Sequence, residues 1–385
     1  MIVRSDTPAL RPATVSDVRS AVLDAVATDT PLRIIGADTW QDAGPPVESS
    51  RTLSLRDLSG IIAYVPGDLT ITVFAGTSLA ELAHATAAHG QWLGLDATGD
   101  RLGTIGATIA TASVGPLAHA FGTPRDLILG VEAVTGYGDV VRPGGRVVKN
   151  VAGFDLVRLY TGSWGTLGPI TSLTLRLRAL PVHDVTLAMT VPDASRLPAL
   201  LEGLRQSTLS LLACEWVDGD TALRLGVSSG SDALLIRLGG NDSFIRGQRA
   251  ALERLSACTP VDAGVWSALA DLDNGATAVV RFSGSIRELP GRIARLRPSF
   301  GATGTTVSMH ASVSRGVVRV RVTNDPDSAR IVLQTDAAGE TRIPERLPAA
   351  WWATEPDPFR VGLAGRIRAA FDPQLLCNRR VAGDA

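Results

Sequence analysis

The chain is almost without lysine. Of the 37 lysines and arginines among its 385 residues, Lys149 is the single lysine. A phosphate-binding P-loop needs lysine followed by serine or threonine, because the ammonium contacts the phosphates and the hydroxyl contacts magnesium. Lys149 is followed by Asn150, which excludes P-loop and kinase-type chemistry. Any Schiff-base mechanism would have to use Lys149 itself.

Residues that hold metals are also scarce. The three cysteines, Cys214, Cys258 and Cys377, lie far apart and form no C-x-x-C motif. They therefore cannot assemble a zinc or iron–sulfur ligand set of the usual spacing. The five histidines form neither H-x-H nor H-E-x-x-H. We expect no metal site.

The sequence has neither an excess of one charge nor a long apolar run. Its net charge of −1 gives no electrostatic footprint for nucleic acid or for an anionic membrane surface. No stretch of about 18 apolar residues occurs, and residues 1–12 lack the apolar core of a signal peptide. We expect a cytoplasmic protein with no direct membrane insertion and no nucleic-acid partner.

The composition is that of a globular protein, with 45% hydrophobic and 19% charged residues. A helix is predicted from Ser16, strands at 32–35 and 70–74, and a helix after Ser78, which has capping-box spacing to Glu81. After Leu180-Pro181 a second pattern begins. Strands are predicted there at 185–191, 209–216, 222–227, 233–238, 276–282, 305–310 and 316–322, with helices at 194–204, 244–255 and 286–296. This alternation predicts an α+β fold with helices on an antiparallel sheet.

Glycine is concentrated in one stretch. Fourteen of the 39 glycines fall within residues 99–168. Glycine lets the backbone approach a ligand closely, so this density suggests a ligand-binding cradle. Tight turns between short strands would give the same density. The stretch contains neither the Rossmann G-x-G-x-x-G motif nor the G-x-S-x-G of a hydrolase, since Gly162-Ser163 has the wrong spacing.

Four motifs follow one another in this region. They are Gly103-Thr-Ile-Gly-Ala-Thr-Ile-Ala-Thr-Ala-Ser113, Phe121-Gly-Thr-Pro-Arg-Asp-Leu-Ile-Leu-Gly130, Gly145-Arg-Val-Val-Lys-Asn-Val-Ala-Gly-Phe-Asp-Leu156 and Gly162-Ser-Trp-Gly-Thr-Leu-Gly168. Together they resemble the PCMH-type FAD-binding domain of the vanillyl-alcohol oxidase superfamily. The last two are most similar to the glycolate oxidase E-subunit family, and Phe371-Asp-Pro-Gln-Leu-Leu-Cys-Asn378 resembles its closing motif. The resemblance implies a PCMH-type FAD-binding domain at 1–181, a smaller α+β cap domain at 182–350, and a C-terminal segment at 351–385 that packs back on the first domain.

The resemblance also implies which residues bind the flavin. Two segments would bind the FAD pyrophosphate through backbone N–H groups, as an anion-binding nest does: Gly36, Ala37, Asp38 and Thr39, and Thr104, Ile105, Gly106 and Ala107. Thr111 and Ser113 would add hydroxyl groups. Gly165, Thr166, Leu167, Gly168 and Ile170 would pack beside the flavin. Lys149 would place its positive charge near the flavin or a phosphate, where it would stabilise the reduced cofactor, although a lone lysine can also fall there by chance.

Several positions depart from the family pattern. Ile34-Ile35-Gly36-Ala37 keeps a single glycine where relatives commonly have R-G-G-G, and it offers no histidine for a covalent flavin bond. FAD is therefore expected to be non-covalent. Trp164 stands where a glutamate is usual, a change that E subunits tend to share, and Arg379 stands where proline is usual.

No catalytic set is evident. Lys149 and His310 are the candidates for a catalytic role. His310 is the single histidine after residue 183, and a packed or exposed strand residue explains it better than a catalytic base does. The resemblance implies an FAD subunit that helps oxidise glycolate, a small 2-hydroxy acid, to glyoxylate. Its partners would be a catalytic D-type flavin subunit and an iron–sulfur subunit. The alternatives are a stand-alone FAD-dependent oxidase or dehydrogenase of another 2-hydroxy acid or alcohol, and a flavin-free scaffold subunit.

Overall fold

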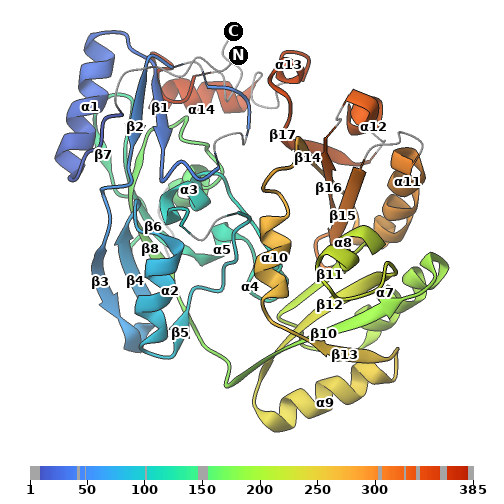
Figure 1. Ribbon diagram of the computed structural model, residues 1–385. Helices are drawn as coiled ribbons and strands as arrows, with labels where there is room; N and C mark the ends of the chain where they lie inside the picture. Colours follow the sequence, from blue (N-terminus) through green and yellow to red (C-terminus); the bar gives the residue numbers. More distant parts are fainter. Residues whose placement is uncertain are drawn as a thin grey trace. The chain divides into compact units, whose positions relative to one another are not determined.

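The computed structural model describes residues 9–40, 44–47, 49–99, 102–145, 155–301, 306–324, 327–334, 339–355 and 362–379 (Figure 1). The chain forms two compact units. The first comprises Met1–Val114, Gly122–Leu180 and Ala349–Ala385, and the second comprises Gly115–Phe121 and Pro181–Pro348. The short segment Gly115–Phe121 thus belongs to the second unit, whereas the sequence-based division assigned it to the first. The functional division into FAD-binding domain, cap domain and returning segment stays a prediction.

The first unit is built on a five-stranded antiparallel sheet in the order β3-β4-β8-β6-β7. Its strands are β3 (Ile61–Val65), β4 (Thr70–Phe74), β6 (Ile128–Val134), β7 (Val140–Val141) and β8 (Ile170–Arg176). Two smaller ladders accompany it: parallel β1 (Leu32–Ile35) and β2 (Arg51–Ser54), and antiparallel β5 (Gln91–Trp92) and β9 (Arg178–Ala179). The helices are α1 (Val15–Ala27), α2 (Leu79–Ala87), α3 (Ile105–Ala110), α5 (Pro124–Leu127), α6 (Leu156–Tyr160), α13 (Ala349–Trp352) and α14 (Leu363–Phe371).

Helix α1 lies against β1 and β2 (Figure 1), where Val18 and Val22 share a buried apolar cluster with Leu32 and Leu53. It begins two residues earlier than the sequence predicted. Thr14, not Ser16, is the N-cap, because Thr14 and Asp17 form a reciprocal capping box. The predicted N-cap of α2 is confirmed, since the Ser78 side chain accepts the N–H of Glu81.

The second unit contains an eight-stranded antiparallel sheet in the order β13-β10-β12-β11-β15-β16-β14-β17. Its strands are β10 (His183–Val191), β11 (Ala213–Val217), β12 (Asp232–Gly240), β13 (Cys258–Val261), β14 (Ala278–Ser283), β15 (Thr306–Ser312), β16 (Val317–Thr323) and β17 (Thr341–Arg346). Its helices are α4 (Ala118–Phe121), α7 (Leu197–Gln206), α8 (Gly219–Arg224), α9 (Asp242–Glu253), α10 (Val265–Asp271), α11 (Leu289–Gly301) and α12 (Arg330–Gln334).

The predicted α+β class with an antiparallel sheet is confirmed. One element prediction is wrong: 222–227 is not a strand. Residues 219–224 form α8 instead, because the Asp218 side chain accepts the Thr221 N–H and so caps a helix at this point.

No helix in the part of the chain that the structure describes is long and apolar enough to cross a bilayer.

Candidate functional site

The turn after β1 has the backbone of an anion-binding loop. Within the described ranges, the N–H groups of residues 36–39 donate to no backbone carbonyl. Gly36 is buried, and a Cβ there would lie 2.1 Å from Thr104 Oγ1, so only glycine fits without moving Thr104. Asp38 adopts a left-handed φ of 60° and pairs with Arg33 at 3.4 Å. The turn can therefore present successive N–H groups to an anion such as a pyrophosphate.

The second expected pyrophosphate segment, residues 104–107, is used differently by the fold. Thr104 is the N-cap of α3. The next two N–H groups already have protein acceptors, since Ile105 donates to the Thr77 carbonyl at 2.9 Å and Gly106 donates to the Ala75 carbonyl at 2.8 Å. These two N–H groups are thus occupied, and the segment contributes by packing Thr104 against Gly36. Binding of the cofactor by residues 104–107 stays a prediction.

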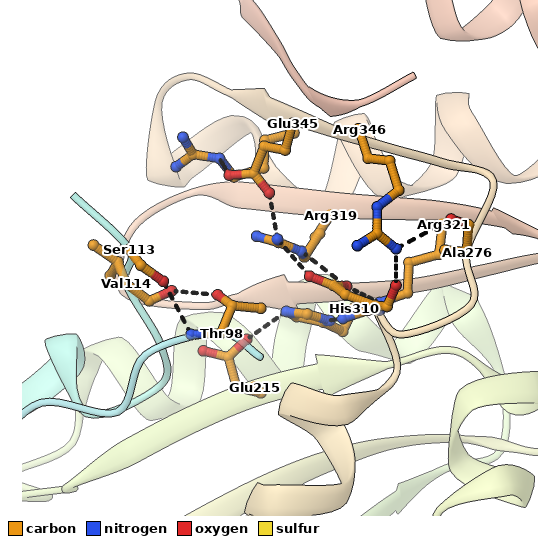
Figure 2. Close-up of polar contacts among 12 residues, drawn as sticks. Thr98, Ser113, Val114, Glu215, Ala276, His310, Arg319, Arg321, Glu345 and Arg346 are labelled. Atoms are coloured by element: carbon orange, nitrogen blue, oxygen red, sulfur yellow. Dashed lines mark hydrogen bonds and ion pairs between the residues drawn. The ribbon is translucent and has the colours of Figure 1, made fainter. Parts of the chain in front are cut away.

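The two expected hydroxyl groups differ in what they can still offer. Thr111 Oγ1 donates to the Ala107 carbonyl within its own helix at 2.9 Å. Ser113 Oγ accepts the backbone N–H of Thr98 at 3.1 Å (Figure 2), which leaves its own proton available to another acceptor. Ser113 is therefore the better candidate donor of the two.

The loop before β8 has a strained backbone. Trp164, Gly165 and Gly168 adopt positive φ angles of 53°, 73° and 112°. A left-handed φ is rare for a bulky residue, and such strain is typical of functional segments. Trp164 is held there by its N–H bond to the Ala110 carbonyl at 2.8 Å, and its ring stacks on Trp40 with centroids 6.3 Å apart. Thr166 and Leu167 within this loop, and Ile170 at the start of β8, are buried.

The loop and the turn after β1 are thus joined through Trp40 and Trp164. Three of the expected flavin-binding segments, residues 36–39, 104–107 and 164–168, contact one another directly or through these rings within the first unit. Lys149, the expected cation, lies outside the described residues.

His310, the other catalytic candidate, lies on β15 in the second unit. Its cross-strand partners are Val217 on β11 and Arg319 on β16, and Arg319 in turn faces Arg281 on β14. Cross-strand partners share a sheet face. One face of the sheet therefore changes from apolar at Val217, which belongs to a buried cluster with Trp266, to charged at Arg319 and Arg281.

The charged part of this face is an ion-pair network (Figure 2). Asp273 accepts from Arg319 Nη2 at 2.6 Å and from Arg321 Nε at 2.5 Å. Glu345 pairs with Arg319 and with Arg281. Burial opposes ionisation of Asp273, but Arg319 and Arg321 outweigh it and hold its pKa below the ordinary value. The network is therefore charged at neutral pH.

The network also sets the tautomer of His310. Arg321 Nη2 lies 2.7 Å from His310 Nδ1, and Glu215 Oε2 lies 3.9 Å from His310 Nε2 (Figure 2). Burial, then Arg321 and Arg319, hold the pKa of His310 well below its ordinary value, so the ring is neutral. Because a guanidinium can only donate, Nδ1 is the acceptor and the ring proton sits on Nε2. In this form Nε2 can only donate, and Glu215 Oε2 at 3.9 Å is beyond hydrogen-bond distance, so His310 has no free lone pair for a substrate proton. A catalytic role for it stays a prediction.

This neutral histidine predicts a pH-dependent stability. Below pH 6.5 the unfolded chain binds a proton at His310 that the folded chain does not, so the free energy of unfolding decreases as pH falls. Between about pH 7.5 and 5.5 the loss amounts to about 1.4 kcal/mol. Urea unfolding of wild type and His310→Gln at both pH values measures it, with the exposed His84→Gln as control. An equal pH dependence of wild type and His310→Gln would contradict the assignment.

Comparison with known proteins agrees with this geometry. Residues 8–144 match a family model described as an FAD binding domain. The chain is 33% identical over 233 residues to the glycolate oxidase subunit GlcE of Escherichia coli (strain K12), covering 60% of this chain and 62% of that protein. It is 31% identical over 204 residues to the glycolate oxidase subunit GlcD of Bacillus subtilis (strain 168), covering 50% and 42%. The matches thus span about three-fifths and two-fifths of these two relatives.

A solved structure of alkyldihydroxyacetonephosphate synthase superposes with a TM-score of 0.72, covering 96% of this chain and 76% of that one, at 17% sequence identity. This likeness concerns the fold. The predicted PCMH-type fold, the family resemblance and FAD as the cofactor of the domain are confirmed by these comparisons. The individual cofactor-binding residues stay predictions. The sequence reasoning missed Trp40 and Asn378 as candidate site residues, although Asn378 ends the motif that resembled the family's closing sequence.

Proposed function

We propose that the protein is an FAD-dependent oxidoreductase and the FAD-binding subunit of a glycolate oxidase-like complex, since residues 8–144 match a family model described as an FAD binding domain. In this complex it takes part in the oxidation of a small 2-hydroxy acid, glycolate, to glyoxylate. The observation that carries the proposal is the match to subunit GlcE across 60% of the chain, combined with a turn at residues 36–39 whose N–H groups donate to no backbone carbonyl of the described residues.

FAD, when bound, supplies the acceptor for the electrons and hydride removed from the substrate. The chain's own residues bind and orient it. The N–H groups of residues 36–39 would bind the pyrophosphate, Ser113 would donate its hydroxyl proton to the cofactor, and the loop 164–168 would pack beside the flavin. A carboxylate-bearing substrate in addition requires cations and a proton acceptor. His310 cannot be that acceptor while its Nδ1 accepts from Arg321, so the D-type subunit would supply it.

The chain's cysteines also support a role inside a complex. Cys214 and Cys377 are buried, and burial raises the thiol pKa of both. Their spacing with Cys258 fits no iron–sulfur ligand set. In the proposed complex, the iron–sulfur subunit and not this chain would therefore hold such a cluster.

The visible spectrum of the purified chain and glycolate turnover with an artificial acceptor test this proposal. We expect flavin absorbance in the chain, and turnover only when a D-type flavin subunit and an iron–sulfur subunit are co-expressed with it. Turnover by the chain alone would favour a stand-alone dehydrogenase. Absence of flavin absorbance, even after FAD is added, would favour a flavin-free scaffold, for which the single glycine of the turn at residues 36–39 is the supporting feature.

A further inference from the structure

Asn378 ties the C-terminal end of the described chain to two segments of the first unit. Its side-chain Oδ1 accepts the N–H of Ile34 at 2.7 Å, and its Nδ2 donates to the Trp164 carbonyl at 2.6 Å and to the Ile34 carbonyl at 3.4 Å. Ile34 lies two residues before Gly36, and Trp164 directly precedes Gly165. One buried amide thus bridges the strand that leads into the turn at residues 36–39 and the strained loop at 164–168.

The backbone around Asn378 is itself fixed. Its N–H donates to the Leu32 carbonyl at 2.9 Å, and the Leu32 N–H donates to the Leu376 carbonyl at 2.8 Å. The preceding turn is closed by Asp372, whose Oδ2 accepts the Cys377 N–H at 2.7 Å. Asn378 adopts a φ of 46°, a left-handed conformation that asparagine and glycine tolerate best. The side chain is therefore presented from a rigid turn in one orientation.

Two further observations indicate that Asn378 positions these segments and does not merely fill space. Trp164 is held at a left-handed φ, and its carbonyl, which sets the direction of the next peptide, accepts from Asn378. Gly165 approaches so closely that a Cβ there would lie 2.7 Å from Asn378 Nδ2. The amide of Asn378 donates two hydrogen bonds and accepts one, all with backbone groups. Together they resist sliding of one segment past the other.

We infer that Asn378 is a positioning residue for flavin binding: it clamps the turn at residues 36–39 and the loop at 164–168 in the relative placement that FAD requires. The inference rests on the proposed function, since those two segments are the ones assigned to the cofactor. Asn378 acts through backbone groups of Ile34 and Trp164, so its loss weakens FAD binding without removing a group that would contact FAD.

Two variants separate the contributions of the amide. Asn378→Gly removes the side chain but keeps a residue that suits the left-handed φ. Asn378→Asp keeps the acceptor for the Ile34 N–H but places a carboxylate oxygen against the Trp164 carbonyl. Leu82→Ala, a cavity variant in α2, is expected to lower stability in the same unit at a position outside both segments and serves as control.

The experiment titrates FAD into the apo form of each full-length variant and records flavin fluorescence and visible circular dichroism. We expect Asn378→Gly to weaken FAD binding about tenfold or more and to change the dichroism of the bound flavin, Asn378→Asp to fall between it and wild type, and Leu82→Ala to bind like wild type. Binding by Asn378→Gly within about twofold of wild type, with unchanged dichroism, overturns the inference.

Hydrogen exchange at the Ile34 amide separates this inference from the proposed function. Asn378→Gly is expected to speed this exchange relative to Leu82→Ala, whether or not FAD is present. A wild-type chain that takes up no FAD contradicts the proposed function, and exchange at wild-type rate in Asn378→Gly contradicts the clamp.

Discussion

Replacing Asp273 with alanine is expected to lower the free energy of unfolding of the second unit by about 3–5 kcal/mol. Asp273 is 1% exposed and is the shared acceptor for Arg319 and Arg321, which are 5% and 1% exposed. Without its carboxylate, two guanidinium groups remain buried with less negative charge to balance them. Removing one partner of a buried ion pair costs far more than the pair itself contributes, because the remaining charge stays desolvated.

The variant Asp271→Ala provides the matched control. It removes a carboxylate two residues away that is exposed at the end of α10, and surface substitutions of this kind usually change stability by less than about 0.5 kcal/mol. Urea unfolding of the two variants, monitored by tryptophan fluorescence, measures the difference. Equal stability of Asp273→Ala and Asp271→Ala would show that the ion-pair network contributes nothing.

The same residue predicts the response to acid. The folded-state pKa of Asp273 lies below its ordinary value, so its contribution to stability is present above about pH 4 and is lost as the pH falls below it. Wild type should therefore lose stability below pH 4 more steeply than Asp273→Asn, which cannot ionise.

Much of the fold could be predicted because its signals are local. The strands at 32–35 and 70–74 were predicted with the bounds that β1 and β4 have, since each short apolar or alternating run ends at a turn. The cap of α2 needed only Ser78 and Glu81, three residues apart. The strand prediction for 222–227 is wrong because the helix α8 is set by its N-cap, Asp218, which lies four residues before this apolar run.

The ion-pair network could not be predicted from the sequence. Arg319 and Arg321 alternate with Val318 and Val320, which is typical of a strand with one face in water. In the structure both faces of β16 are buried, and the arginines are paired with Asp273. Asp273 lies 46 residues before Arg319 along the chain, just after α10, so no local pattern reveals the pair. The ion pair forms because β14, which follows Asp273 along the chain, pairs with β16, which carries both arginines.

The candidate flavin site likewise has features that the sequence shows and features that depend on contacts between distant segments. The resemblance carried by the motifs indicated candidate segments for it, and these stay predictions. The motifs did not predict which N–H groups are occupied by protein carbonyls, as those of Ile105 and Gly106 are, because that depends on contacts with Thr77 and Ala75. Trp40 and Asn378 were missed because their partner, Trp164, lies far from both in sequence.

Replacing Gly168 with alanine is expected to lower the free energy of unfolding of the first unit by about 3 kcal/mol and to reduce FAD retention. Two costs combine at this position. Its φ of 112° is one that residues with a side chain rarely adopt, and a Cβ would lie 2.0 Å from the Val134 carbonyl oxygen at the end of β6. Because the clashing atom belongs to backbone, no side-chain rotation relieves the contact, and the loop at 164–168 must shift.

Gly60→Ala isolates the first of these costs. Gly60 has nearly the same φ, 115°, but a Cβ there meets no atom within 4 Å. Its variant should lose about 1–2 kcal/mol through backbone strain alone and should retain FAD like wild type. Thermal unfolding and flavin absorbance after gel filtration measure both effects. If the two alanine variants lose the same stability and retain the same FAD, the close approach of Gly168 to Val134 does not hold the loop. A larger loss in both measurements for Gly168→Ala would instead tie the placement of this loop to cofactor binding, because the two variants share the backbone strain and differ in the clash.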